Sequence, residues 1–343
     1  MLPACRIKAI FNRHAIPVFV IFCAFSWHKS GGSGLRGHAQ RDRTQARSLS
    51  YLRHPPSFLR PHTRSVFPMP SIHQLRLALN GRIPPCAKQA YLKLREFNSS
   101  VRALPDFLVL GAQKSGTTSL FNYLCQHPKV IGSVPKEIFY FCSHSEKDAS
   151  WYRRHFPRQS VVRKRGAICG EATPISLYYS HAAKRAAELV PQAKLIVILR
   201  EPAARAVSHY YHQLRAGVET RSIDEVFSAE NITKWTAGEC PDLQQRYYFS
   251  WSDYATGLKH WLAHYPREQL LVLEAEKMFT DVQATVDKAC DFLALESFSL
   301  PTTQAFNTGT TKAEKPRNFK ALQDAFTRQN SELQNLGFEM SWI

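Results

Sequence analysis

The sequence predicts an α/β fold in which a central parallel sheet is covered by helices on both faces, a three-layer arrangement like that of P-loop proteins. Apolar runs of strand length occur at residues 107–111, 194–200 and 269–278. Each run is followed by a segment whose apolar residues recur with helical spacing. Strands that are apolar along their whole length are typical of parallel sheets, because both faces of such sheets are buried.

The elements follow one another in the order expected of strand–helix units. FLVLG, ending at Gly111, precedes a helical pattern over 119–127, and KLIVILR precedes one over 203–216. QLLVLEAEKM reads as a third strand, and residues 281–295 read as the helix that packs after it. Ligands of such sheets bind beyond the carboxyl ends of the strands. The residues after Gly111 and around Arg200 are therefore the first candidates for a site.

The first 95 residues differ from the rest in charge. They contain 16 Lys or Arg and one acid, Asp42, a net charge of +15, whereas the remainder has 29 basic and 26 acidic residues. They also contain a 13-residue apolar run from Ala15 to Trp27, which has the length of a signal-peptide core and is short for a membrane span. This run is an anchor, a cleaved signal or part of a transit peptide.

We accordingly expect three parts: a short signal-anchor or targeting segment over 1–30, a basic disordered stem over 31–95, and a globular domain over 96–343. A nucleic-acid-binding tail is not expected, because no aromatic or motif context accompanies the charge. Eight scattered cysteines without a C-x-x-C pair argue against a zinc site. Sequons at Asn98 and Asn231 would be used only in a secretory lumen.

The stretch GAQKSGTTSL, residues 111–120, combines a strand end, a glycine turn and a helix start. Such a junction presents backbone N–H groups and the positive end of a helix dipole to an anion. Gly111 and Gly116 have the spacing of a P-loop, but Thr117 stands where a nucleotide triphosphatase has its lysine. The lysine here is Lys114. A phosphotransferase or NTPase is thereby disfavoured, and a non-catalytic nucleotide-binding protein stays open as a further alternative.

The chain resembles sulfotransferases that use 3′-phosphoadenosine 5′-phosphosulfate (PAPS). GAQKSGTTSL resembles their 5′-phosphosulfate loop, and LREPAARAVSHYY, residues 199–211, resembles their 3′-phosphate motif. KEIFYF (136–141), WYRRHFP (151–157), GEATP (170–174) and residues 254–273 follow in the order of the family. The resemblance covers about residues 105–340 and is strongest to the Golgi carbohydrate sulfotransferases of heparan and chondroitin sulfate type.

The resemblance implies PAPS as the cofactor, with no divalent metal required. Lys114 would neutralise the charge that develops on the leaving phosphate. Arg200 and Ser208 would hold the 3′-phosphate, although a strand-end salt bridge and a helix-surface serine are their ordinary alternatives. Lys312 would add a phosphate contact. The 5′-phosphate would be held by the residues of the loop and the first helical turn: Ser115, Gly116, Thr117, Thr118 and Ser119.

The resemblance also implies an acceptor side. Glu137 matches the general base of the heparan sulfate branch, and Lys136 and Glu171 are candidate substrate contacts. The alternatives are a surface pair between Glu137 and Lys136 and a buried structural carboxylate at Glu171. We expect His209 and His212 to have packing or surface roles. Tyr254, Trp261 and Tyr265 have helical spacing and are expected in the core, with Tyr254 alone toward the cofactor.

Two positions depart from the heparan sulfate pattern, with Ala172 in place of a lysine and Phe139 in place of His or Gln. A carbohydrate acceptor, with a glycosaminoglycan-like polysaccharide as the main candidate, is implied without the position sulfated. The family further implies a Golgi membrane protein, single-pass type II with a lumenal catalytic domain and attached through the N-terminal segment. A secreted protein or one targeted to an organelle is the alternative.

Overall fold

The centre of the fold is a sheet of five parallel strands in the order β2-β3-β1-β4-β5. The computed structural model describes residues 85–239, 243–306 and 314–343, which belong to one compact unit. The strands are β1 (Phe107–Gly111), β2 (Val130–Gly132), β3 (Ile168–Ala172), β4 (Lys194–Leu199) and β5 (Leu270–Glu274). The predicted α/β class with a parallel sheet is confirmed.

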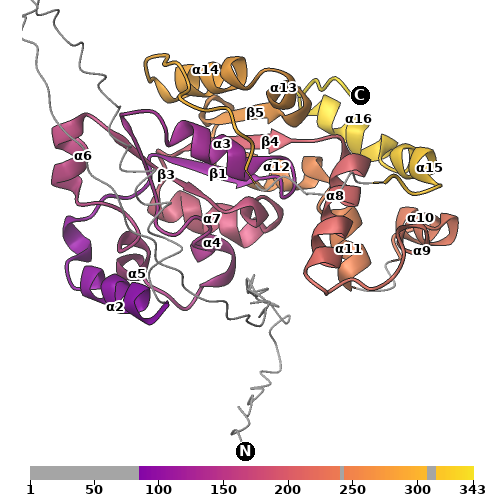
Figure 1. Ribbon diagram of the computed structural model, residues 1–343, viewed down its shortest axis with the longest axis horizontal. Coiled ribbons are helices and arrows are strands. Elements are labelled where there is room, and N and C mark those ends of the chain that lie inside the picture. The colour runs from indigo at the N-terminus through magenta and orange to yellow at the C-terminus, as the bar shows by residue number, and fades with distance from the viewer. Residues whose placement is uncertain (1–84, 240–242, 307–313) are drawn as a thin grey trace, which may run out of the picture. The chain divides into compact units, whose positions relative to one another are not determined.

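Alternate residues of the central strand face two helical layers (Figure 1). Phe107 and Val109 pack with α3 (Thr117–Leu124), α13 (Ala275–Thr280) and α14 (Val282–Leu293). Leu108 and Leu110 share the other core. That second core includes side chains of α4 (Tyr140–Ser143), α5 (Ala149–Arg153), α6 (Gln159–Arg165), α7 (Ser180–Leu189), α12 (Tyr254–Leu262) and α16 (Thr327–Asn335). The alternation follows from the two-residue repeat of a strand buried on both faces.

A third apolar cluster joins the helices of a separate lobe that lies on the side toward which the strands run (Figure 1). Its helices are α8 (Pro202–Arg215), α9 (Ile223–Val226), α10 (Ala229–Thr236), α11 (Leu243–Ser250) and α15 (Phe319–Asp324). Three short 3₁₀ turns, η1 (Ser99–Val101), η2 (Pro174–Tyr178) and η3 (Arg267–Gln269), connect the elements. The helix α2 (Pro85–Glu96) precedes the sheet.

Two expectations differ from the structure in extent. The predicted strand over 269–278 ends at Glu274, and the helix α13 begins at Ala275, because Ala, Glu, Lys and Met are strong helix formers. The helix α2 lies inside the stretch expected to be stem. The apolar run 15–27 lies outside the described residues, and within those residues no helix has the length and apolar character needed to cross a membrane.

Candidate functional site

The junction between β1 and α3 forms an open cradle of backbone groups. Gly116 precedes the helix with a φ of 93°, and no side chain caps the helix N-terminus. The positive φ favours glycine at this turn, and a Cβ at Gly116 would also lie 2.5 Å from Cε at the flexible end of Met278. The first N–H groups of any α-helix have no acceptor inside the helix. They are therefore available to an anion at this junction.

Polar side chains of the same loop also suit an anionic ligand. Ser115 is fully buried, and its hydroxyl has no hydrogen-bond partner among the described residues. Thr117 is buried and Thr118 half-buried in the first turn of α3. The Ser119 hydroxyl is engaged elsewhere, because it accepts a hydrogen bond from the Phe306 N–H at 3.0 Å. Ser119 thus fixes the backbone at Phe306, the last described residue before 307.

Arg200 joins this loop to the junction between β4 and α8. Its Nη1 donates to the Lys114 carbonyl oxygen at 3.4 Å, and its guanidinium lies 5.7 Å from the ring centre of Phe279. The Tyr254 hydroxyl donates to the Arg200 carbonyl at 2.7 Å, so Tyr254 reaches this side as predicted. Ser208 is half-buried in α8. The two predicted phosphate motifs are therefore neighbours in space.

His212 is a further candidate for the site, beside the residues predicted from the sequence. It follows Ser208 by one helical turn, and burial lowers its pKa to about 4, helped by the positive charge of Lys114 and opposed by Glu137. Its imidazole is half-buried and interacts electrostatically with both groups, and the expected packing or surface role stays a prediction for His212. His209 packs as expected, since its buried ring stacks 5.3 Å from Trp251. The i, i+4 spacing from Ser208 was the available signal.

Glu137 lies on an irregular segment held by the end of β3. Both Glu137 and Phe139 have positive φ values, 63° and 58°. The Glu137 N–H donates to the Ala172 carbonyl at 3.0 Å, and the Phe139 N–H donates to Thr173 Oγ1 at 3.4 Å. The Glu137 carboxylate is 38% exposed and forms an ion pair with Lys136. The surface pair considered from the sequence is present.

Glu171 lies behind that segment, away from solvent. It is 2% exposed, and its two carboxylate oxygens accept hydrogen bonds from the Tyr152 hydroxyl and, at 2.5 Å, from Thr173 Oγ1. Burial raises the pKa of Glu171, while both hydrogen bonds act in the opposite direction. Because Thr173 also accepts from Phe139, these contacts favour the structural alternative and connect Glu171 to the Glu137 segment.

The last predicted contact, Lys312, lies outside the described residues. On either side of that stretch, Phe306 is bonded to Ser119 of α3, and the Glu314 N–H donates to the Tyr211 hydroxyl of α8 at 3.0 Å. Within the described part of the chain, no group of three or more His, Cys, Asp or Glu side chains is placed to hold a metal ion.

Comparison with known proteins gives concordant matches. A family model described as a sulfotransferase domain matches residues 104–336. The bifunctional heparan sulfate N-deacetylase/N-sulfotransferase 4 of Mus musculus is 30% identical over 218 residues, which cover 62% of this chain and 24% of that protein. The heparan sulfate glucosamine 3-O-sulfotransferase 3B1 of Homo sapiens is 31% identical over 203 residues, covering 58% and 48%. The chain thus spans between a quarter and a half of these relatives.

A solved structure shows the same fold. The sulfotransferase from Alicyclobacillus acidocaldarius is 28% identical, with a TM-score of 0.54, and the match covers 70% of this chain and 99% of the other.

Proposed function

Because this chain belongs to the sulfotransferase domain family, we propose that it transfers a sulfuryl group from PAPS to a hydroxyl or amine of a carbohydrate. The observation that carries the proposal is the hydrogen bond from Arg200 to the Lys114 carbonyl. It holds two anion-binding motifs side by side, which suits a nucleotide with phosphates at its 5′ and 3′ positions. The buried, unpartnered Ser115 hydroxyl and the open start of α3 fit the 5′ end of such a ligand.

Each side chain of the site would have a role that follows from its position. When bound, PAPS would supply the sulfuryl group and a phosphate as the leaving group. The Lys114 ammonium would neutralise charge on that phosphate, and the N–H groups of residues 116–118 would orient it, since the Ser115 N–H donates to the Ala112 carbonyl. Arg200 and Ser208 would bind the 3′-phosphate, with Lys312 as a further contact. The neutral imidazole of His212 would serve as a hydrogen-bond acceptor between the parts of the site that contain Lys114 and Glu137.

The acceptor would bind on the Glu137 side of the site. The Glu137 carboxylate would take the proton that the acceptor oxygen or nitrogen loses as its bond to sulfur forms. Lys136 would pair with an acidic group of the acceptor, and Glu171 would act on the acceptor only through Thr173 and the Glu137 segment. The relatives that carry heparan sulfate in their names support a glycosaminoglycan-like polysaccharide as the acceptor.

The cellular setting is part of the proposal. The apolar run 15–27 behind basic residues, and the two sequons, support a type II protein of the Golgi membrane with a lumenal domain. Asn231 Nδ2 donates to the Glu225 carbonyl at 2.9 Å and to the Val226 carbonyl at 3.4 Å, and glycosylation there would leave one N–H for these two acceptors. Endoglycosidase treatment of the cellular protein, compared with Asn98→Gln and Asn231→Gln, tests the lumenal location.

Calorimetric titration of the full chain with 3′-phosphoadenosine 5′-phosphate, beside ATP with Mg²⁺, tests the cofactor class. We expect the bisphosphate to bind, ATP to bind weakly, and Arg200→Ala to abolish the preference. A sulfation assay with desulfated heparan and chondroitin acceptors then compares the wild type with Glu137→Gln. Tight Mg²⁺-ATP binding without bisphosphate binding would establish the phosphotransferase reading. Bisphosphate binding without transfer to any acceptor would establish a non-catalytic binding protein.

A further inference from the structure

The helix α2 and the turn η1 expose apolar side chains and bury polar ones. Phe97 is 91% exposed, Leu94 67%, Tyr91 56% and Val101 51%, and we call these four residues the α2 outer surface. On the inner side, Arg95 is only 8% exposed. An amphipathic helix of a globular protein normally places its apolar stripe against the core. The arrangement in α2 is therefore inverted.

Polar bonds, rather than apolar packing, attach α2 to the domain. Arg95 donates to the Phe156 carbonyl oxygen, and Arg102 Nη1 donates to the same oxygen at 3.0 Å. Arg102 Nε also donates to the Arg95 carbonyl at 3.1 Å, and Arg154 forms an ion pair with Glu96 at 2.6 Å. Because these bonds secure the inner side, the α2 outer surface is not required for docking the helix. Contiguous exposed apolar residues of this kind mark binding surfaces.

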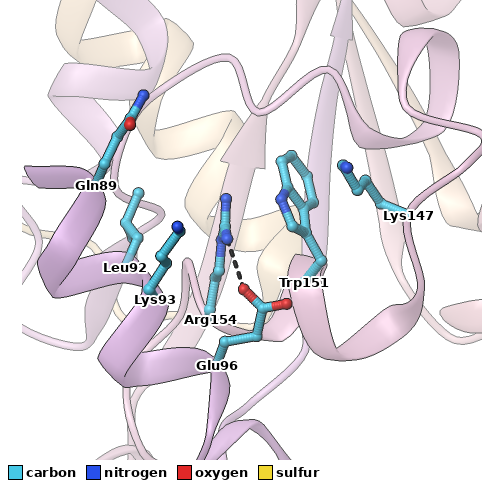
Figure 2. A pocket seen from close by; sticks show the side chains of 7 residues that line it. All are labelled: Gln89, Leu92, Lys93, Glu96, Lys147, Trp151 and Arg154. Carbon is cyan, nitrogen blue, oxygen red and sulfur yellow. Dashed lines mark hydrogen bonds and ion pairs between the residues drawn. The ribbon is translucent and has the colours of Figure 1, made fainter. Parts of the chain in front are cut away.

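A positively charged pocket of about 350 Å³ adjoins this surface between α2 and α5. In Figure 2 the polar ends of Gln89, Lys93 and Arg154 point in the same direction beside the Trp151 ring. The Arg154 guanidinium lies 4.5 Å from the Trp151 ring centre. The pocket is lined by three cations, Lys93, Lys147 and Arg154, and by one acid, Glu96. Arg154 is paired with Glu96, and Lys147 lies 3.7 Å from the carboxylate of Glu146, so Lys93 is the lining cation for which no ion pair is found among the described residues. The pocket is suited to an anionic group.

We propose that the α2 outer surface and this pocket bind a lipid bilayer, with the apolar side chains in the headgroup–acyl boundary and the pocket around an anionic headgroup phosphate. Exposed apolar residues flanked by lysine and arginine have the composition of interfacial membrane-binding segments. The same face suits a polysaccharide poorly, because a sugar chain offers Leu94 and Val101 no apolar phase to enter.

Charge and connectivity favour a bilayer over the other occupants. A second copy of this chain would set two positive pockets against each other. Residues 1–84 contain 13 Lys or Arg and one acid, so their net charge does not complement Lys93 and Lys147. Those residues also hold the apolar run 15–27 and join α2 directly at Pro85. The α2 outer surface therefore belongs to the first described helix after the expected membrane segment in the sequence.

Vesicle flotation of the full chain tests the proposal, because residues 1–84 contribute equally to every variant. Vesicles of phosphatidylcholine with about 30 mol per cent phosphatidylserine are compared with phosphatidylcholine alone. We expect Leu94→Ser with Phe97→Ser to lower partitioning about tenfold on both vesicles. Lys93→Gln should lower it about fivefold on the anionic vesicles only. The matched control is Leu214→Ser with Val218→Ser, which alters two exposed apolar residues elsewhere, 38% and 41% exposed, and should change nothing.

Three results would overturn the proposal. Unchanged partitioning of the Leu94/Phe97 variant would assign membrane binding to residues 1–84 alone. A concentration-dependent dimer in sedimentation velocity that this variant abolishes would make the surface an interface between copies. Loss of heparin retention in Lys93→Gln, with vesicle binding unaltered, would make the pocket a polysaccharide site. Circular dichroism and bisphosphate binding, which should equal those of the wild type, verify that each variant is folded.

Discussion

The two strand-to-helix junctions of the site have the same topology, but the N-terminus of one helix is uncapped and that of the other is capped. At β1–α3, Gly116 leaves the helix start without a side-chain cap. At β4–α8, the Glu201 carboxylate accepts hydrogen bonds from the N–H groups of Ala203 at 3.1 Å and Ala204 at 2.7 Å, and Pro202 has no N–H to offer. One junction presents backbone donors to a ligand, whereas the other has already used its own.

If the proposed function holds, this difference lets one fold bind two phosphates by different means. The open junction can orient an anion with backbone groups, which no side-chain substitution removes. The capped junction must rely on Arg200 and on Ser208 of α8. Substitutions should therefore act on catalysis and geometry at the first junction and on affinity at the second. Substitutions at both junctions test this contrast, and we expect the greatest change from Lys114.

Lys114→Ala should lower kcat about 10²- to 10³-fold, because it removes the cation that stabilises charge on the leaving phosphate. Bisphosphate affinity should fall far less, since the backbone donors at the start of α3 remain. A sulfation assay and calorimetry on the same preparation separate the two effects. Lys129→Ala is the matched control, because Lys129 is an exposed lysine paired with Glu296. Equal losses in kcat and affinity would contradict the division between the junctions.

Arg200→Ala should weaken binding of 3′-phosphoadenosine 5′-phosphate about tenfold to a hundredfold, the size of a lost charge-assisted hydrogen bond pair. Binding of adenosine 5′-phosphate, which lacks the 3′-phosphate, should hardly change. Calorimetry with both nucleotides measures this selectivity, and Arg200→Lys should recover only part of it. If both nucleotides lost affinity equally, Arg200 would act by holding the Lys114 loop rather than by binding the 3′-phosphate.

Gly116→Ala should lower the free energy of unfolding by about 2 kcal/mol, through strain at positive φ and crowding of the Met278 methyl group. Chemical denaturation measures the loss. The same substitution in a Met278→Ala background should cost less, because the backbone strain and the 3.3 Å approach to the Phe279 ring then remain without the Met278 clash. An identical cost in both backgrounds would show that Met278 moves aside freely.

Glu201→Ala should lower the free energy of unfolding by about 1 kcal/mol, the usual cost of losing an N-cap. Bisphosphate affinity should rise about threefold, since a carboxylate beside the expected 3′-phosphate is removed and the N–H groups of α8 become free. Thermal unfolding and calorimetry follow the two quantities, and Glu201→Gln keeps the acceptor while removing the charge. Weaker binding in Glu201→Ala would mean that the cap positions Arg200.

His212 should produce the smallest effect, a less than about twofold change in kcat/KM between pH 5.5 and 8 from its own titration. Its pKa is lowered to about 4, so the imidazole stays neutral over this range. Between pH 6.5 and 4 the unfolded chain binds this proton and the folded chain does not, so acidification through that window destabilises the protein. A pH–rate profile with an acid limb near 6.5 that disappears in His212→Gln would contradict this assignment.

The parts of the fold and site that could be predicted depend on local patterns. The strands β1 and β4 were evident because each is an apolar run of five or more residues bounded by turn or charged residues. The proximity of Lys114 and Arg200 followed from parallel strands ending at one edge of a sheet. Tyr254 was expected on the cofactor side and contacts Arg200.

The remaining features depend on tertiary contacts that no local pattern encodes. The backbone of Glu137 adopts a positive φ because Ala172 and Thr173 bind its segment. The burial of Glu171 depends on Tyr152, which comes from a helix distant in sequence. The helix α2 resembled stem because its apolar residues face outward and thus give no core-facing signal. These cases share one cause, namely that the contact partners of each residue are determined by the tertiary structure.

The position of β1 at the centre of the sheet has a consequence for the folding of the protein. Its neighbours β3 and β4 lie about 60 and about 90 residues further along the chain, so both pairings close long loops and form slowly. The Lys114–Arg200 bond can form only after the second pairing. A bisphosphate that bridges these junctions would bind the fully assembled sheet alone and shift the population toward it. The nucleotide should thus serve as a pharmacological chaperone, and recovery of its binding should mark the last step of refolding.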